Sequence, residues 1–328
     1  MRDVEVSAPG KLFVIGEYAV LHGARALLVA LDAGITARAE RSRRWRLVAP
    51  DLGLEAPLED VLPDSGAALL AASVAAARDD LCIAEAFTVI VRGSTAASRR
   101  KHGLGGSAAS AVAILGALMA ARGADIADEE TRSMLFSLAL SVHRAHQRGR
   151  GSGADVAASV YGGWIDYAAG EAKPRISRVT VPADIRVAAA WSGVASDTAR
   201  AIAAFEPQAH LRPLRAILER FWAAIRAVDR DAMLCEIEAY GRKLESFAAG
   251  AGAERIARLS AAARALGWAA KGSGAVGGDC AIAIGFGDRD AGGLERDWRA
   301  AGAQPLDVSV AVDGVHAVCA KSGEELHA

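Results

Sequence analysis

The chain has 328 residues, which is long for one hydrophobic core and predicts two domains. Its 38 basic and 39 acidic side chains nearly cancel, so the net charge indicates neither nucleic acid nor an anionic membrane as a partner. The four cysteines form no CxxC pair and show no other metal-ligand spacing, which is typical of reduced thiols in a cytoplasmic protein. We therefore expect neither a zinc site nor a disulfide framework.

The N-terminus passes from Met1 directly into the strand-like Val4-Glu5-Val6, so we expect no signal peptide and no export. The longest nearly uncharged stretch of helical character, 107–121, is shorter than the ~20 residues that a membrane span needs. We therefore interpret that stretch as a buried helix.

The first half of the chain alternates short and long apolar segments. Short runs bounded by turn residues predict strands at 4–6, 11–15, 26–31, 34–39 and 87–91. Longer segments with helical periodicity predict helices at 65–77, 107–121 and 129–146. The expected class of this half is mixed α and β.

The second half is predicted to be rich in helix. After a connector at 169–174 comes a strand at 187–191, and a helical pattern then extends from 198 to 266. A closing sheet is expected from strands at 280–284, 306–312 and 315–318, with Asp313-Gly314 as the hairpin turn between the last two.

Three glycine-bearing segments carry the chemistry: 9–11 (Pro-Gly-Lys), 101–109 (Lys-His-Gly-Leu-Gly-Gly-Ser-Ala-Ala) and 271–279 (Lys-Gly-Ser-Gly-Ala-Val-Gly-Gly-Asp). Glycines let backbone N–H groups approach an anion, and the helix expected after the middle segment adds the positive end of its dipole. The middle segment has neither the ending of a P-loop nor the spacing of the dinucleotide fingerprint. Alone it is better explained as a flexible turn before a buried helix. The three segments together predict a phosphate-transfer site.

These segments resemble the three motifs of the GHMP kinase superfamily, and the likeness extends over most of the chain. Within that group the chain looks most like the phosphomevalonate kinases, through 10–21, the glycine loop with Lys101, 151–158, 161–163 and 278–280. The resemblance implies an α+β, two-domain GHMP kinase fold. We expect an N-terminal α/β domain like domain 2 of ribosomal protein S5 at 1–168, and a ferredoxin-like, helix-rich domain at 169–328.

The resemblance further implies an ATP- and Mg²⁺-dependent phosphotransferase of the mevalonate route to isoprenoids, which converts 5-phosphomevalonate to 5-diphosphomevalonate. The expected partner is a small phosphorylated acceptor, with no nucleic acid and no membrane, for a monomer or homodimer. The alternatives are mevalonate kinase or another small-molecule GHMP kinase, a decarboxylase that phosphorylates its substrate transiently, and a non-catalytic nucleotide-binding homologue. Mevalonate kinases typically have a histidine where Tyr18 stands and a magnesium-holding glutamate where Arg144 stands, so both positions favour the phosphomevalonate branch.

By resemblance, Asp155 orients the acceptor and accepts its proton, and Lys11 contacts the phosphate and keeps Asp155 ionised. Ser107 is the implied Mg²⁺ ligand. The alternative interpretation makes Asp155 and Ser107 helix caps and Lys11 a surface residue. The implied ATP-binding residues are Lys101, Gly103, Leu104, Gly105, Gly106, Ser107 and Ala108. The implied substrate-binding residues are Tyr18, Ser152, Gly153, Ser192, Ser196, Gly274 and Ala275.

The third segment is expected to form a hairpin-like loop packed on the glycine loop. Basic residues flank the site segments and suit a phosphorylated acceptor: Arg99, Arg100, Lys101, Arg144, Arg148 and Arg150. His143 matches a histidine of the phosphomevalonate kinase pattern, and we expect it to make a structural hydrogen bond rather than to bind metal with His146. Gly106, Val276 and Ala154 depart from the residues usual in the family.

Overall fold

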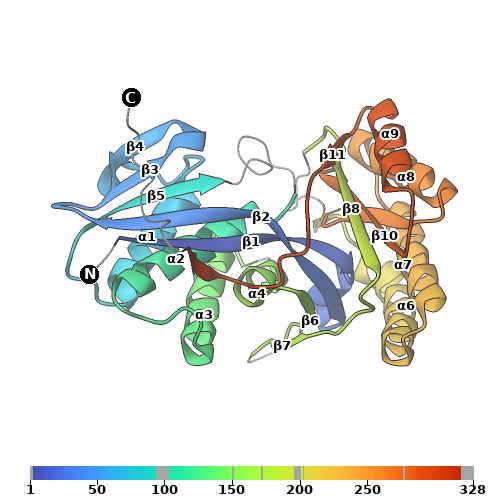
Figure 1. Ribbon diagram of the computed structural model, residues 1–328, viewed down its shortest axis with the longest axis horizontal. Helices are drawn as coiled ribbons and strands as arrows, with labels where there is room; N and C mark the ends of the chain where they lie inside the picture. The colour runs from blue at the N-terminus through green and yellow to red at the C-terminus, as the bar shows by residue number, and fades with distance from the viewer. Residues whose placement is uncertain are drawn as a thin grey trace.

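The computed structural model describes residues 3–93, 103–149, 151–170, 173–195, 201, 203–275 and 278–318. The chain forms two β-sheets, an eight-stranded one built mainly from its first half and a four-stranded one from its second half. Figure 1 shows them in the two ends of an elongated molecule, each covered by its own helices. The expectations at Arg99, Arg100, Lys101, Arg150, Ser196 and Val276 lie outside the described residues.

The first sheet is organised around two long antiparallel strands, β1 (Val4–Ile15) and β2 (Arg25–Arg41). Its order is β12-β1-β2-β5-β3-β4, with β6 paired to β2 and β7 paired to β6. The remaining members are β3 (Arg46–Ala49), β4 (Leu54–Pro57), β5 (Phe87–Gly93), β6 (Trp164–Ala168), β7 (Arg175–Arg178) and β12 (His316–Val318). The runs predicted as separate strands at 4–6 and 11–15 join into β1 through an irregularity between Ala8 and Gly10, and 26–31 and 34–39 join into β2.

The helices of the first half are α1 (Ala68–Asp80), α2 (Gly106–Ala121), α3 (Glu129–His146) and α4 (Ala154–Tyr161). α2 packs against β1 and β2 and is surrounded by α1, α3 and α4. Its side chains from Ala111 to Leu118 are fully buried, which explains why this stretch is apolar on every face and confirms the predicted buried helix. No helix in the described part of the chain is long and apolar enough to cross a membrane.

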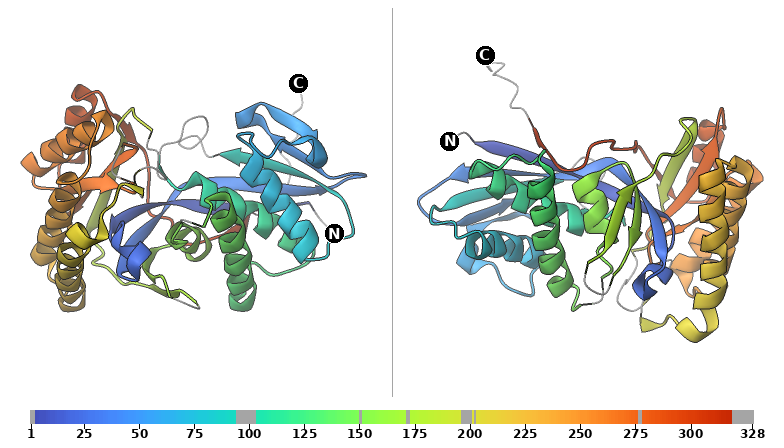
Figure 2. Two further views of the ribbon diagram at one scale, coloured as in Figure 1. Left: turned by 180° about the vertical axis from the view of Figure 1, so that it is seen from behind. Right: turned by 90° about the horizontal axis from the view of Figure 1, so that it is seen from below.

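The second sheet has the order β11-β8-β10-β9, and all its pairings are antiparallel. Its strands are β8 (Ile185–Trp191), β9 (Ala269–Ser273), β10 (Cys280–Phe286) and β11 (Gln304–Leu306). Its helices are α6 (Pro207–Ala227), α7 (Arg230–Glu245), α8 (Ala251–Ala265) and α9 (Ala291–Ala300). The long helical pattern predicted at 198–266 contains α6, α7 and α8, whereas α9 follows β10 and lies outside that pattern. Both views of Figure 2 place these helices at the end of the molecule opposite to α1 and α3.

The predicted hairpin at Asp313-Gly314 is wrong. β11 pairs with β8 in the second sheet, whereas β12 pairs with β1 in the first, so the chain between them crosses from one sheet to the other. Gly314 meets the end of α4, where a Cβ atom on it would lie 2.0 Å from the carbonyl oxygen of Val160. The Asp-Gly pair allows a turn by local chemistry, but contacts distant in the sequence select the partners of the flanking strands.

The predicted division at residues 168 and 169 stays a proposal. The strands β7 and β12 follow that boundary in sequence, yet both hydrogen-bond within the first sheet.

Candidate active site

The three glycine-bearing segments lie together. The backbone N–H of Lys11 donates to the carbonyl of Leu104 at 2.7 Å, and its Nζ donates to the carbonyl of Gly103 at 3.3 Å. Gly103 in turn lies against Asp279, since a Cβ atom at Gly103 would come within 2.5 Å of the Cβ of Asp279. The strands β9 and β10 pair Ser273 with Cys280, so the described parts of the third segment, 271–275 and 278–279, are the two arms of a hairpin, and its Asp279 packs on the glycine loop, as predicted.

Lys11 is only 7% exposed, which contradicts the alternative that it is a surface residue. Its side chain passes directly over Gly105, where a Cβ atom would stand 2.8 Å from the Lys11 Cγ. Gly105 also has a left-handed backbone, with φ 80° and ψ 21°, and forms the N-cap of α2. Glycine at 105 therefore satisfies two demands, the positive φ and the close passage of the lysine.

Ser107, His143 and Asp155 form a polar cluster contributed by three helices, α2, α3 and α4. The His143 Nε2 lies 3.1 Å from the Ser107 hydroxyl and 3.7 Å from the Asp155 Oδ2, and the Gln147 amide nitrogen lies 3.4 Å from it. His143 is fully buried, whereas the Asp155 side chain is 19% exposed. The structural hydrogen bond expected of His143 is thus made to the predicted Mg²⁺ ligand.

Neither Ser107 nor Asp155 is a helix cap, so that interpretation is wrong. The N-caps of α2 and α4 are Gly105 and Gly153, and no side chain caps either helix. Each of them is the second residue of its helix, and Asp155 Oδ1 accepts from the Val156 N–H at 3.0 Å from within the first turn of α4.

The turn that leads into α4 is fixed through the carbonyl of Ser152. This oxygen accepts from the Tyr167 hydroxyl at 2.5 Å and from the Arg144 guanidinium at 3.1 Å. Gly153 follows with φ 87°, and a Cβ atom there would lie 2.3 Å from a methyl carbon of Leu140. Burial raises the pKa of Tyr167 to about 12, while the charge of Arg144 opposes that rise. Tyr167 was missed by the sequence reasoning because no motif marks it.

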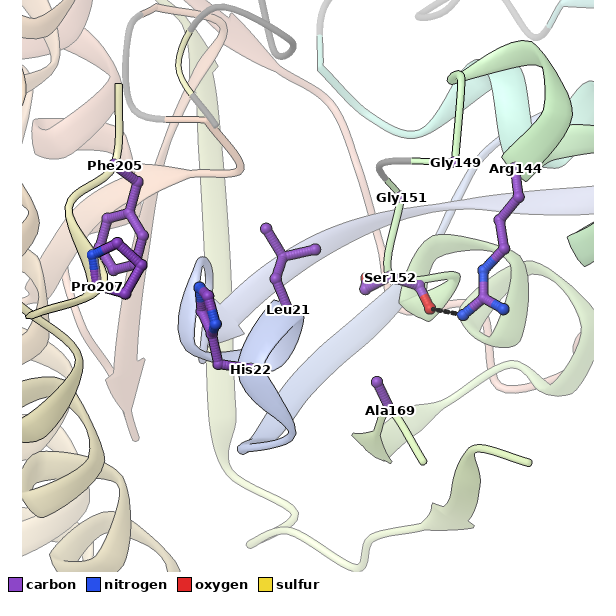
Figure 3. A pocket seen from close by; sticks show the side chains of 9 residues that line it. All are labelled: Leu21, His22, Arg144, Gly149, Gly151, Ser152, Ala169, Phe205 and Pro207. Atoms are coloured by element: carbon purple, nitrogen blue, oxygen red, sulfur yellow. Dashed lines mark hydrogen bonds between the residues drawn. The ribbon is translucent and has the colours of Figure 1, made fainter. Parts of the chain in front are cut away.

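A cavity of about 320 Å³ opens beside this turn. It is lined by Leu21, His22, Arg144, Gly149, Gly151, Ser152, Ala169, Phe205 and Pro207. Figure 3 shows Arg144 and Ser152 on one side and Leu21, His22 and Phe205 on the other. No carboxylate is among these lining residues, and Arg144 provides a cation, so the cavity suits an anionic ligand.

Tyr18 lies at the end of β1 in a tight and strained turn. Its backbone has φ 60° and ψ −51°, and the N–H of Ala19 donates to the carbonyl of Glu17 at 2.6 Å. This is the rare form of γ-turn, and such outliers cost about 1–3 kcal/mol. The Tyr18 hydroxyl donates to the carbonyl of Ala275 at 2.7 Å, and its ring stacks on Phe205 at 4.8 Å. Two predicted substrate residues, Tyr18 and Ala275, are therefore in direct contact.

Ser192 lies beside the third segment, to which Gly274 itself belongs. The Ser192 hydroxyl is fully buried and bonds with the backbone of Val194, while the Ser192 N–H donates to the Asp279 carbonyl at 2.8 Å.

Gly106 is the first residue of α2, and a Cβ atom there would meet nothing within 4 Å. Its departure from the family residue therefore leaves space unfilled and creates no clash.

Oxygen ligands of the kind that Mg²⁺ prefers are present at this place. The Ser107 hydroxyl and the Asp155 carboxylate both face His143 Nε2, although the described residues include no cluster of three or more His, Cys, Asp or Glu that would hold a metal alone. Mg²⁺ in phosphotransferases is commonly held by one or two protein oxygens together with substrate phosphates and water. The donor set therefore fits a metal that arrives with a nucleotide.

The comparisons with known proteins agree with this geometry. Residues 85–163 match the family described as GHMP kinases N terminal domain. A phosphomevalonate kinase from Streptomyces sp. strain CL190 is 29% identical over 96% of this chain and 99% of its own length. A mevalonate kinase from Methanothermobacter thermautotrophicus is 31% identical over 48% of each chain. The Streptococcus pneumoniae phosphomevalonate kinase, solved in complex with phosphomevalonate and AMPPNP, superposes with a TM-score of 0.80 at 21% identity, covering 94% of this chain and 100% of that one.

The fold is thus the two-domain fold of GHMP kinases. Residues 85–163 thus match the N-terminal domain family of GHMP kinases, and the chain is similar to a phosphomevalonate kinase over nearly its whole length.

Proposed function

We propose that the protein is a kinase that transfers the γ-phosphoryl group of ATP to 5-phosphomevalonate, giving 5-diphosphomevalonate and ADP. The observation that carries this proposal is the convergence of Lys11, the glycine loop and the third segment beside the Ser107–His143–Asp155 cluster. The similarity to the Streptomyces phosphomevalonate kinase over nearly the whole chain supports the choice of acceptor.

In the proposed reaction an oxygen of the acceptor phosphate attacks the γ-phosphorus in line, the bond to the β-phosphate oxygen breaks, and ADP leaves. The glycine loop and the N-terminus of α2 would bind the nucleotide phosphates through backbone N–H groups. Lys11 would neutralise charge on the transferring group. Ser107 would hold Mg²⁺ together with the nucleotide phosphates, and the bound ion would supply further neutralisation of the triphosphate.

A phosphate monoester that is already ionised needs no base to become a nucleophile. Asp155 would then act chiefly by orienting the acceptor, and Lys11 would carry more of the rate. The cavity beside Ser152, with Arg144 and His22 in its lining, is the proposed place for the acceptor. Arg144 at a position where mevalonate kinases carry a glutamate supports an acceptor with more negative charge.

Mevalonate kinase is the second candidate, and the match to the Methanothermobacter mevalonate kinase over 48% of the chain supports it. With mevalonate the nucleophile is a hydroxyl, whose proton has to pass to a base, and Asp155 is the group in position to take it. The two candidates therefore differ in how strongly the rate depends on Asp155.

The deciding experiment measures ADP release from Mg·ATP by the purified protein with 5-phosphomevalonate, with mevalonate and without acceptor. Turnover with 5-phosphomevalonate alone, with a stable product and no CO₂ release, is the expected result. Turnover with mevalonate alone would establish the second candidate. ATP binding without turnover on either acceptor would contradict both and favour a non-catalytic homologue.

A further inference from the structure

A buried ion pair joins the two sheets behind the candidate active site. Glu17, which follows β1, is 2% exposed, and Lys271 on β9 is fully buried, with its Nζ donating to the Glu17 carboxylate. The two residues are 254 positions apart in the sequence. Removing both charges from water is costly, and a pair compensates for that cost only when its geometry and its additional hydrogen bonds are good.

The surroundings of this pair meet that condition for Lys271 and for Glu17 Oε1, whereas the buried Glu17 Oε2 has no hydrogen-bond partner among the described residues. Lys271 Nζ also donates to the carbonyls of Gly272 at 2.7 Å and Phe13 at 3.3 Å, so its three acceptors match the three N–H bonds of an ammonium group. Glu17 Oε1 accepts from the N–H of Gly274 at 3.4 Å as well. Burial raises the pKa of Glu17 and lowers that of Lys271, and the attraction between the two charges opposes both shifts.

The backbone of Glu17 is held as firmly as its side chain. The Tyr240 hydroxyl, from α7, donates to the Glu17 carbonyl at 2.6 Å, and the same carbonyl closes the strained turn at Tyr18. A non-glycine residue stays in such a conformation only where its neighbours over-determine it. The contact between Tyr18 and Ala275 is thereby anchored on both sides, through Glu17 on one and through Gly274 on the other.

We propose that Glu17, Lys271 and Tyr240 form a positioning clamp, which holds Tyr18 and the third-segment loop in the arrangement that binds the acceptor. The clamp residues act through Tyr18 and Ala275 and do not themselves contact the reacting atoms. The kinetic test below uses 5-phosphomevalonate as the acceptor and therefore rests on the proposed function. The structural test needs no acceptor and does not depend on that function.

The kinetic test compares Glu17→Gln, Lys271→Met, the double variant and Tyr240→Phe. Each charge-removing single variant leaves one buried charge unpaired, so we expect a lower urea midpoint for both and a recovered midpoint for the double variant. The acceptor KM is expected to stay about tenfold or more above that of the unmodified protein in all four variants, including the double, with the KM for Mg·ATP changed by less than about twofold. The control is Arg220→Met and Glu236→Gln, an ion pair between α6 and α7 in which the arginine side chain is 56% exposed and the glutamate side chain 12%, and these variants should change neither KM.

The structural test is hydrogen exchange of the segments 11–18 and 269–275 in the protein without ligands. Faster exchange in both segments of the clamp variants, and not in the Arg220 and Glu236 controls, is the expected result. Unchanged exchange in all clamp variants, or a double variant that regains both the urea midpoint and the acceptor KM, would overturn the clamp. Faster exchange in a protein that does not use 5-phosphomevalonate would support the clamp and reject the proposed acceptor.

Discussion

Lys11 and Asp155 are the two residues on which the proposed chemistry depends most. Lys11 runs over Gly105 with its Nζ at the carbonyl of Gly103, and Asp155 lies in the first turn of α4 beside His143. Neither side chain is needed to cap a helix or to close a core. Their removal is therefore expected to affect the rate far more than the fold.

We expect Lys11→Met to lower kcat by about 10²–10³-fold, because a positioned cation is lost from the transferring phosphoryl group. Asp155→Asn should lower kcat by about 10²-fold with 5-phosphomevalonate, because this acceptor has no proton to lose and is only held less well in the orientation for attack. Steady-state kinetics measure kcat for the two variants, and thermal unfolding checks that each variant is folded. The matched controls are Lys173→Met and Asp64→Asn, two exposed positions. Full activity in both site variants would contradict the site assignment.

Cys280 illustrates how strand position controls reactivity. It is fully buried on β10 between β8 and β9, whereas Cys82 and Cys235 are exposed. Burial raises the pKa of the Cys280 thiol, and the charge of Asp279 raises it further. Since the thiolate is the reactive form, we expect iodoacetamide to modify Cys82 and Cys235 in the native protein and to spare Cys280. Peptide mass spectrometry reads the result, with urea-unfolded protein as the control. Native modification of Cys280 as fast as that of Cys82 would be inconsistent with this packing.

At the scale of elements, the start of α2 offers a matched pair of adjacent glycines. Gly105 has a left-handed backbone and the Lys11 side chain against it, whereas a Cβ atom on Gly106 would meet nothing within 4 Å. The same substitution is therefore expected to have opposite consequences at the two positions.

Gly105→Ala should destabilise the protein by about 1–2 kcal/mol through the positive φ alone, and should lower kcat further by displacing Lys11. Gly106→Ala should be neutral or stabilising by less than about 1 kcal/mol, since alanine favours the helix. Urea unfolding and kcat for the two variants test this, and equal losses at both positions would show that the loop geometry differs from the one described.

The whole molecule keeps all four of its tyrosines in environments that disfavour the phenolate. Burial raises the pKa of Tyr18, Tyr161, Tyr167 and Tyr240, to about 12 for Tyr167. The folded state thus binds the phenolic protons more tightly than the unfolded state does.

This difference in proton binding determines how the stability of the fold changes at alkaline pH. The stabilisation is complete below the unfolded pKa of about 10 and is lost as the pH rises toward the folded values. We expect the urea midpoint to fall between about pH 9 and pH 11, and tyrosinate absorbance to rise together with unfolding. Tyr167→Phe should reduce the fall. Tyrosinate absorbance that appears at the pH of free tyrosine while circular dichroism is still native would refute the prediction.

The local chemistry of the sequence was sufficient for the long helices and for the motifs, whereas the strands β3, β4, β6, β7 and β9 were not predicted. The helix predicted at 129–146 has those bounds in the structure, because Asp128 supplies a side-chain cap at its start and the apolar positions repeat at helical spacing. The buried helix at 107–121 was predicted from its lack of charged residues, and α2 differs from that prediction by one residue. The glycine segments that suit phosphate binding could likewise be predicted, because the backbone freedom of glycine is a property of the residue itself.

Only the tertiary structure decided which of these pieces meet. No local pattern indicates that residues 316–318 pair with β1 in the first sheet. Nor does any local pattern indicate that Glu17 pairs with Lys271, which lies 254 positions further along the chain. The placement of His143 between Ser107 and Asp155 and the strained turn at Tyr18 likewise depend on neighbours from other helices and strands. The physical reason is that propensity and motif chemistry act over a few residues, whereas strand partners and buried polar pairs are selected by the free energy of burying distant surfaces together.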